Sequence, residues 1–229
     1  MGRGVVLALC VLLLAACTGG DRDDRDGGDT GFGEAGSDLR SAAQPGEAPR
    51  RLIAGWTVTV YYTPVARFHA GPTVPVTGCR SIDCAGGDDP LGEHPETFVA
   101  AVREEGTGRT ADGRYLNWSH DTGYWLDTAP RDASGRALRA WTSAAADRDV
   151  MAEGTRFTVV DCGKDNEGFA IDAPVCARLR AARWTVTDEF TPGLGGPRHV
   201  DLYLGEQTGP NFTANPLYIS LYGASLSVG

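Results

Sequence analysis

Two aspartates, Asp188 and Asp201, flank a segment of the chain with the sequence EFTPGLGGPRHV. Pro removes a backbone donor and Gly favours unusual backbone angles, so this segment predicts a wide turn. Such a turn can bring the two carboxylates close together, which is a common way to keep one of them protonated near neutral pH. The alternative is that both are ordinary turn-flanking aspartates without a chemical role.

The segments on either side of this turn have the alternation of half-buried strands. In HVDLYLG, Asp201 and Tyr203 share one face, and Leu202 and Leu204 share the other. In ARWTVTD the alternation and the β-rich composition place Asp188 near the end of a strand. The pattern therefore predicts a strand, a wide turn and a second strand, with one carboxylate on each strand.

The remainder of the folded region also consists mainly of short strand patterns. One clear helix is predicted in HPETFVAAVREEG, with Pro95 at an allowed first-turn position and Gly106 as its stop. Many short strands separated by Gly and Pro turns, with little helix, predict an all-β sandwich or barrel with small helical insertions. The other strand patterns are GWTVTVYYTP, RYLNW, TGYWLDT, GTRFTVVDCG and NPLYISLYGASLSVG.

The N-terminal residues resemble a bacterial lipoprotein signal. The sequence MGRGVVLALCVLLLAAC has a short basic start, a brief apolar run and small residues before Cys17. The resemblance implies a signal peptide over residues 1–16, cleavage before Cys17 and a lipid on its sulfur, which anchors the mature protein to the outer face of the cytoplasmic membrane in the cell envelope. An ordinary secretory signal cut nearby is the alternative.

Residues 17–50 are dense in Gly and Asp and nearly free of large apolar side chains. Such a segment cannot bury a core, so it predicts a disordered tether that holds the folded domain away from the membrane. Residues 51–229 are enough for one domain with a sizeable core, which we expect to be monomeric. The net charge of −9 argues against a nucleic-acid partner, although part of this charge lies in the tether.

Four cysteines remain in the folded region once Cys10 leaves with the signal and Cys17 is lipidated. An even number of cysteines in an exported domain favours disulfides. Of the three possible pairings, proximity in sequence favours Cys79 with Cys84 and Cys162 with Cys176. A zinc site is the alternative, but the spacing is not that of paired CxxC knuckles.

No cofactor motif and no metal-ligand spacing stands out elsewhere in the sequence. The sequence DTG at Asp121 is typical of aspartic proteases, but that chemistry needs two such aspartates and the chain has one copy. We therefore expect neither a metal nor a cofactor. The histidines without metal spacing are His69, His94, His120 and His199.

Three segments together resemble a known family. They are AAADRDVMAEGTRFTVVDCG, WTVTDEF and GGPRHVDLYLG, which contain Asp147, Asp188 and Asp201 in this order. This ordered trio is similar to the three-aspartate domain, which is shared by membrane-bound lytic transglycosylase A and by cell-wall remodelling proteins. The resemblance implies a mainly β fold, a six-stranded double-psi β-barrel with small helical and loop insertions. The turn after Asp188 is longer here than in the family.

The resemblance also implies a reaction on peptidoglycan. Asp201 would be the general acid and base that cleaves the bond between N-acetylmuramic acid and N-acetylglucosamine. Asp188 or Asp147 would supply the negative charge that raises the pKa of Asp201. A purely structural role, in which these two carboxylates accept backbone donors and pin loops, is an equal alternative.

Other side chains are weaker candidates for binding the glycan. Arg198 and His199 adjoin Asp201, Tyr203 shares its predicted face, and Trp125 belongs to an aromatic cluster that includes Trp118 and Tyr124. Aromatic clusters are more often part of a core than of a sugar platform.

Two other functions remain open from the sequence. A double-psi barrel can grip a polysaccharide without turnover, as expansin-like relatives are thought to do, because a fold does not fix a function. A hydrolase is the third possibility, with Asp188 or Asp147 as base and water as nucleophile. The distance between the carboxylates separates these alternatives.

Overall fold

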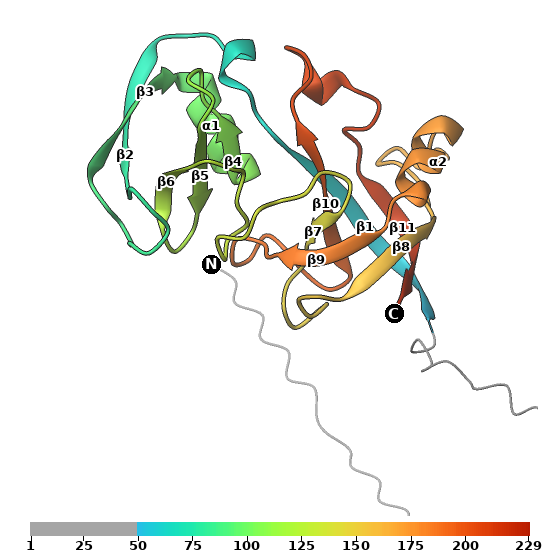
Figure 1. The fold of residues 1–229 in the computed structure, drawn as a ribbon. Coiled ribbons are helices and arrows are strands. Elements are labelled where there is room, and N and C mark those ends of the chain that lie inside the picture. Colours follow the sequence, from blue (N-terminus) through green and yellow to red (C-terminus); the bar gives the residue numbers. More distant parts are fainter. Residues whose placement is uncertain (1–49) are drawn as a thin grey trace, which may run out of the picture. The chain divides into compact units, whose positions relative to one another are not determined.

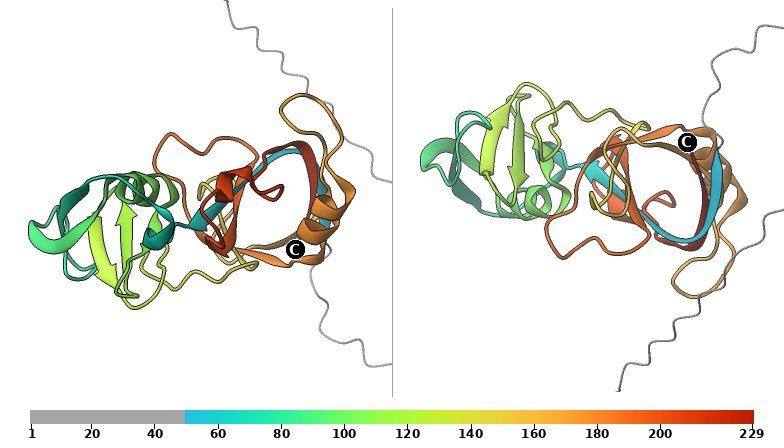
Figure 2. Two further views of the ribbon diagram at one scale, coloured as in Figure 1. Left: turned by 90° about the horizontal axis from the view of Figure 1, so that it is seen from above. Right: turned by 90° about the horizontal axis from the view of Figure 1, so that it is seen from below.

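Six strands of the computed structural model, which describes residues 50–229, close into a barrel (Figure 1). The views in Figure 2 show these strands as a ring. The predicted mainly β fold is confirmed, and so are the two strands that flank the Gly- and Pro-rich turn. In sheet order the barrel strands are β1 (Arg51–Thr63), β10 (His199–Glu206), β7 (Ser143–Ala145), β9 (Trp184–Asp188), β8 (Arg156–Asp161) and β11 (Leu221–Val228).

Strand β10 lies between β1 and β7, and this position decides where its polar residues go. It runs parallel to β1, with Asp201 opposite Thr59, and antiparallel to β7, with Asp201 opposite Ala145. The alternation predicted from the sequence is present, since Val200 and Leu202 are fully buried in the barrel core. Strands β9 and β10 are not direct neighbours, because β7 separates them.

Apolar side chains from all six barrel strands fill one core, to which the short β7 contributes Ala144. Alternate residues of β1, namely Trp56, Val58 and Val60, point into it. Trp184 at the start of β9 is fully buried there. Burial stabilises the barrel by about 1.5–3 kcal/mol for each fully buried large apolar side chain. The polar residues on the opposite faces of these strands are not needed for this core and can form a site.

A smaller lobe is inserted between β1 and β7 (Figure 1). It has its own core, in which Phe98, Val102 and Leu116 are fully buried. The predicted helix is confirmed as α1 and ends at Glu105, because Gly106 takes a left-handed φ of 80° and closes the last turn. The elements of this lobe are η1 (Ala66–Phe68), β2 (Thr73–Gly78), β3 (Asp89–Pro95), α1 (Glu96–Glu105), β4 (Thr107–Arg109), β5 (Tyr115–Ser119) and β6 (Gly123–Asp127).

Polar contacts fix this lobe against the barrel. Glu206 at the end of β10 accepts hydrogen bonds from the Tyr115 hydroxyl at 2.5 Å and from the Arg109 guanidinium at 2.9 Å. A parallel bridge also pairs Arg109 with Val65. The side chain of Gln207 accepts the backbone N–H of Val65 at 3.0 Å. Strands β4 and β5 of the lobe are thereby held beside the end of β10.

The sequence did not predict helix α2 (Ala173–Ala181), which packs against β8. Its start carries a recognisable signal, because Asp172 accepts the backbone N–H of Val175 and Pro174 stands in the first turn. Only Val175 and Leu179 of this helix are buried, so its apolar periodicity is weak. A short 3-10 helix, η2 (Phe212–Ala214), precedes β11.

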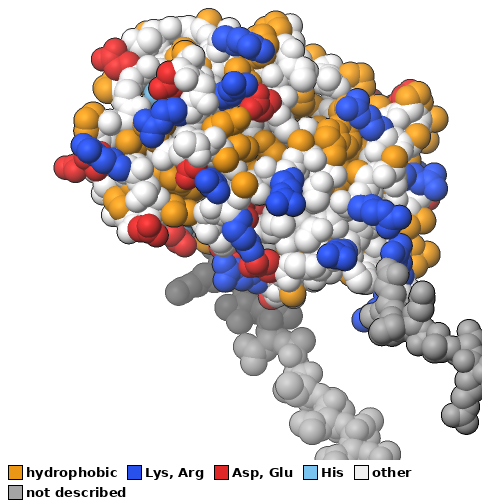
Figure 3. Space-filling model, in the orientation of Figure 1, with side chains coloured by type: hydrophobic (Ala, Val, Ile, Leu, Met, Phe, Trp, Pro, Cys, Tyr) orange, Lys and Arg blue, Asp and Glu red, His pale blue; other side chains and the backbone are white. Residues whose placement is uncertain are grey.

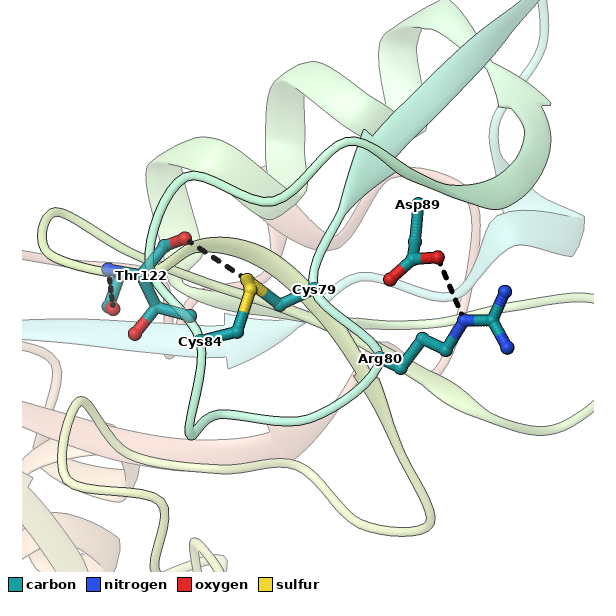
Figure 4. Close-up of a disulfide and its surroundings, with 6 residues drawn as sticks. Cys79, Arg80, Cys84, Asp89 and Thr122 are labelled. Atoms are coloured by element: carbon teal, nitrogen blue, oxygen red, sulfur yellow. Dashed lines mark hydrogen bonds and ion pairs between the residues drawn. A yellow bond between two sulfur atoms is a disulfide. The ribbon is translucent and has the colours of Figure 1, made fainter.

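The four cysteines form the two disulfides that proximity in sequence favours. Cys79–Cys84 closes the loop between β2 and β3, where the N–H of Cys79 donates to the carbonyl of Tyr124, and Figure 4 shows it beside Thr122. Cys162–Cys176 ties the end of β8 to α2. Because all four sulfurs are bonded in pairs, the alternative of a zinc site on these cysteines is wrong.

Loss of the Cys162–Cys176 disulfide is expected to destabilise the domain more than loss of Cys79–Cys84. The loop it closes is longer, 14 against 5 residues of separation, so it restricts the unfolded chain more. Replacing each pair by serines should lower the free energy of unfolding by about 3 and about 2 kcal/mol respectively. Urea denaturation of the two variants measures this, and an equal loss would contradict the entropic reason.

The described residues belong to one compact unit, Pro45–Gly229, with its own closed barrel and cores. The predicted signal peptide, most of the predicted tether and the predicted lipid site at Cys17 lie outside the described residues. Between residues 50 and 229 no helix is both long and apolar enough to cross a membrane. On the face shown in Figure 3, basic side chains lie scattered among acidic and apolar ones.

Candidate active site

A cleft of about 570 Å³ lies between the barrel and the inserted lobe. The barrel contributes Asp147, Asp188 and Asp201 to its lining, and the lobe contributes Glu105 and Trp118. A second cavity of about 310 Å³ adjoins it. The residues common to both linings are Tyr61, Glu104, Glu105 and Asp201. The structure thus brings the three predicted aspartates to one cleft, and Asp201 stands where the two cavities meet.

Asp201 has the most unusual environment of the three aspartates. Its Oδ1 atom is buried and accepts no hydrogen bond from residues 50–229. The pKa of Asp201 is raised to about 7, mainly by burial; a hydrogen bond from Thr59 opposes the shift, and the charge of Asp188 adds to it. The carboxyl group is therefore present in comparable amounts with and without its proton at neutral pH, as proton transfer requires.

Asp188 is held by three donors at the end of β9. Its Oδ1 atom accepts the backbone N–H groups of Ala133 and Glu189, each at 2.9 Å, and its Oδ2 atom accepts the Tyr61 hydroxyl at 3.1 Å. Burial is the main cause that raises its pKa to about 6, and these hydrogen bonds oppose it. Asp188 is consequently mostly ionised at pH 7 and presents a fixed negative charge to Asp201.

Asp147 connects the end of β7 to the turn that precedes β10. Its Oδ2 atom accepts the backbone N–H of Gly196 at 2.8 Å. A side chain on the neighbouring Gly195 would overlap this carboxylate, so the turn approaches Asp147 as closely as a backbone can. The contact positions the turn between Asp188 and Asp201, and it is the structural role considered for Asp147 from the sequence.

We expect Gly195→Ala to disturb this turn. The new methyl group would displace the carboxylate of Asp147 and break its hydrogen bond with Gly196. Glycan cleavage should fall on the order of tenfold, with the thermal midpoint lowered by a few degrees, on the usual scale of one lost hydrogen bond and local overpacking. The matched control is Gly209→Ala, because Gly209 has open space around it and a backbone conformation that alanine can adopt. Gly193 is unsuitable as a control because its φ of 88° would strain an alanine. Unchanged activity in Gly195→Ala with a normal Gly209→Ala would contradict the assignment.

Tyr61 is a member of this site that the sequence did not reveal. Its hydroxyl donates to Asp188, and its ring, which lines both cavities, lies 5.2 Å from the ring of Tyr203. Burial, followed by the charges of Asp188 and Asp201, raises the pKa of Tyr61 well above its ordinary value, so it remains a neutral donor. The alternation of β1 puts Tyr61 on the same face as Thr57 and Thr59, but the sequence does not show that β10 lies beside this strand.

The four residues predicted to bind glycan lie outside the linings of both cavities. Trp125 is fully buried and Tyr203 is 2% exposed, with its hydroxyl 2.6 Å from the Thr63 hydroxyl. Arg198 donates to the carbonyl of Ala54 at 3.0 Å. His199 pairs with the Thr59 hydroxyl at 3.0 Å, and burial lowers its pKa. The structure therefore does not bring these four side chains to the cleft with Asp201, and their contact with glycan stays a prediction.

Trp118 is the aromatic residue of the predicted cluster that does line the cleft. The guanidinium of Arg103 lies over its ring at 5.6 Å from the centroid. Such a stacked pair offers a flat surface with a cation beside it. No group of three or more His, Cys, Asp or Glu side chains within residues 50–229 is arranged to hold a metal ion. Three carboxyl groups that line the cleft, those of Glu105, Asp188 and Asp201, have raised pKa values.

Comparisons with known proteins rest on structure alone. No protein-family model and no curated protein matches the chain. The structure is similar to Escherichia coli MltA with bound chitohexaose, at 14% identity, over 78% of this chain and 71% of that chain, with a TM-score of 0.51. A membrane-bound lytic murein transglycosylase from Agrobacterium tumefaciens matches at 12% identity over 79% and 76%, with a TM-score of 0.48.

MltA from Neisseria gonorrhoeae matches at 13% identity over 76% of this chain and 72% of that chain, with a TM-score of 0.42. We base the comparison of folds on the E. coli protein, whose TM-score exceeds 0.5. At so low an identity the likeness concerns architecture, and the described part of this chain has a fold similar to that of the lytic transglycosylase MltA.

Proposed function

We propose that the protein is an exported, cell-wall-active lytic transglycosylase that cleaves the bond between N-acetylmuramic acid and N-acetylglucosamine in peptidoglycan. The observation that carries this proposal is the environment of Asp201, a carboxyl with a buried, unpartnered oxygen where two cavities meet. The similarity to E. coli MltA, whose structure contains bound chitohexaose, supports a glycan as the ligand of the cleft.

In the proposed reaction Asp201 acts first as an acid and then as a base. Its proton moves to the glycosidic oxygen as the bond from that oxygen to C1 of the muramoyl residue breaks. The C6 hydroxyl of the same residue then attacks C1, and the carboxylate of Asp201 accepts the proton that this hydroxyl loses. The product is a 1,6-anhydro ring, no water is consumed, and Asp201 ends the cycle protonated.

The contacts of Asp188 favour this reaction over hydrolysis. An inverting hydrolase needs a second carboxylate that is free to activate a water molecule. Both oxygens of Asp188 already accept hydrogen bonds, from two backbone N–H groups and from Tyr61. One oxygen of Asp147, Oδ2, accepts the N–H of Gly196. We therefore assign Asp188 to the fixed charge that keeps Asp201 protonated, and Asp147 to the position of the turn.

The finer organisation of the chain belongs to the same proposal. The barrel would have double-psi connections, residues 1–16 would be a signal peptide, and residues 17–50 would tether the 51–229 domain, as a monomer, to a lipid on Cys17. This arrangement places the cleft in the cell envelope near its polymer. Mass spectrometry of the mature N-terminus would detect the lipid on Cys17, and an unmodified N-terminus would contradict the anchor.

Product analysis tests the reaction. Residues 45–229, which form one compact unit, are incubated with purified peptidoglycan, and the released muropeptides are identified by mass spectrometry. We expect 1,6-anhydro-muramoyl ends. Reducing ends would instead indicate a hydrolase. No release, together with retention of the domain on the same peptidoglycan, would indicate a binding module that does not turn over its glycan.

A further inference from the structure

Glu105 is a carboxyl of the cleft that the proposed reaction does not use. It is the last residue of α1, and the left-handed Gly106 ends the helix directly after it. Its side chain lines both cavities together with Asp201. The two carboxyls come from different parts of the fold, since Glu105 belongs to the inserted lobe and Asp201 to strand β10 of the barrel. The glycan proposed for the cleft would pass both of them.

Two hydrogen bonds from the barrel side fix the orientation of Glu105. Its Oε2 atom accepts the backbone N–H of Tyr62 at 3.1 Å, and its Oε1 atom accepts the Tyr218 hydroxyl at 3.2 Å. Tyr62 lies on β1, and Tyr218 precedes β11. The carboxyl is therefore held in one place by two separate segments, which is the arrangement expected of a functional group rather than of a solvated helix end.

The neighbouring carboxyl groups disfavour the ionised form of Glu105. Asp201 faces it from β10, Glu104 precedes it on α1, and Tyr61, Tyr62 and Tyr218 face it from the barrel. Arg103, two residues earlier on α1, is exposed, lines the larger cavity and lies over the ring of Trp118. Within residues 50–229, no ion pair joins Glu105 to a cation.

A half-buried carboxyl without a cation and beside other carboxyls favours the neutral form. The pKa of Glu105 is raised to about 8, mainly by burial; the hydrogen bonds from Tyr62 and Tyr218 oppose the shift, and the charge of Asp201 adds to it. A neutral carboxyl keeps an O–H donor in addition to its acceptor oxygens. Glycans offer acceptors for such a donor in their hydroxyl, ring and acetamido oxygens.

We propose that Glu105 enters the cleft as a neutral carboxylic acid and donates a hydrogen bond to the glycan beside Asp201. This inference rests on the proposed function, because it takes the ligand to be a glycan. It assigns to the inserted lobe a direct part in recognition. Ionisation of Glu105 replaces the donor by a negative charge and weakens binding, so the affinity for glycan falls as the pH rises through the pKa of Glu105.

Binding of a hexasaccharide of N-acetylglucosamine, measured by calorimetry between pH 6 and pH 9.5, tests this role. All variants carry Asp201→Asn, which prevents turnover and removes a neighbouring carboxyl whose pKa of about 7 lies inside this range. The dissociation constant of this parent should rise about tenfold over the range, the scale of one lost hydrogen bond with added repulsion. Because Asp201→Asn also removes a negative charge near Glu105, the midpoint should lie below the wild-type pKa.

Substitutions at Glu105 separate donation from charge. Glu105→Gln keeps an N–H donor, so its dissociation constant should stay within about threefold of the parent at pH 6 and should not change with pH. Glu105→Leu lacks the donor and should bind about tenfold more weakly at pH 6, again without pH dependence. Glu96→Gln, an exposed residue at the other end of α1, is the matched control and should behave as the parent.

Two results would overturn the role of Glu105. One is a Glu105→Gln variant with the same pH dependence as the parent, and the other is a Glu105→Leu variant that is folded and binds as tightly as the parent at pH 6. The protonation state is also measured without glycan, as an infrared carbonyl band of a protonated carboxyl at pH 6.5 that disappears in Glu105→Gln. Absence of that band from the wild-type protein overturns the inference by itself.

The outcomes distinguish this inference from the proposed function. If the parent binds no hexasaccharide and the wild-type protein releases no muropeptide, the glycan function fails and the donation to glycan fails with it, whatever the infrared band shows. If the wild-type protein releases anhydro-muropeptides and the variants at Glu105 show the parental pH dependence, the function stands and the inference fails.

Discussion

Asp201→Asn is expected to lower the rate of muropeptide release by at least about 10³-fold while leaving glycan binding within a fewfold of the wild-type value. An amide of the same shape has no proton to donate to the glycosidic oxygen, and loss of a general acid costs about 10²–10⁴-fold. Here one carboxyl serves both as acid and as base, so the loss should lie toward the upper end. Release of anhydro-muropeptides and retention on peptidoglycan are the two measurements.

Stability distinguishes a chemical role of Asp201 from a structural one. The Oδ1 atom of Asp201 has no hydrogen-bond partner in residues 50–229, so replacing the carboxyl by an amide breaks no contact of that atom. The thermal midpoint of Asp201→Asn should therefore equal or exceed that of the wild-type domain. Asp88→Asn, at an exposed position on the inserted lobe, is the matched control and should cleave normally. An inactive Asp201→Asn that is also much less stable would indicate a folding defect.

The pH dependence of cleavage should have an alkaline limit near pH 7 that moves to lower pH in Asp188→Asn. Asp201 must be protonated to begin the reaction, and its pKa is raised to about 7, so the rate falls as the pH rises through that value. The negative charge of Asp188 is one cause that raises this pKa. Removing the charge lowers the pKa of Asp201 and reduces its protonated fraction, and the rate at pH 7 should fall on the order of tenfold.

The substitution is a fair test because asparagine can preserve the local contacts. Its oxygen can accept the two N–H groups that Oδ1 of Asp188 accepts now, and its amide can face the Tyr61 hydroxyl. At pH 5 the variant should therefore approach the wild-type rate, since Asp201 is protonated in both proteins there. Full activity with an unchanged alkaline limit would mean that Asp188 has only a structural role, as an ordinary aspartate beside the turn.

The elements predicted from the sequence were those whose signals are local. The alternation in β10 correctly placed Leu202 in the core and Asp201 on the opposite face, and Gly106 marked the end of α1. The disulfide pairs also followed from proximity. Helix α2 was missed because few of its residues are buried, so that capping by Asp172 was its main signal. Periodicity reports which face of an element is apolar, and that property is contained in a few consecutive residues.

Only the tertiary structure decided which side chains lie beside the polar residues of the strands. The sequence placed Asp188 and Asp201 on two strands, but β7 separates those strands, and the cleft unites their carboxyls with Tyr61 from β1 and Glu105 from the inserted lobe. Conversely, Trp125 carried an aromatic signal suited to sugars and proved to be core. The sequence by itself determined the strands β1, β5, β6, β8, β9, β10 and β11, the helix α1 and the disulfides, because those signals act over short distances, whereas β2 and β3 were not predicted. The pairing order of the strands and the position of the lobe decided which carboxyls are desolvated together, and desolvation in a shared cleft is what gives them their unusual pKa values.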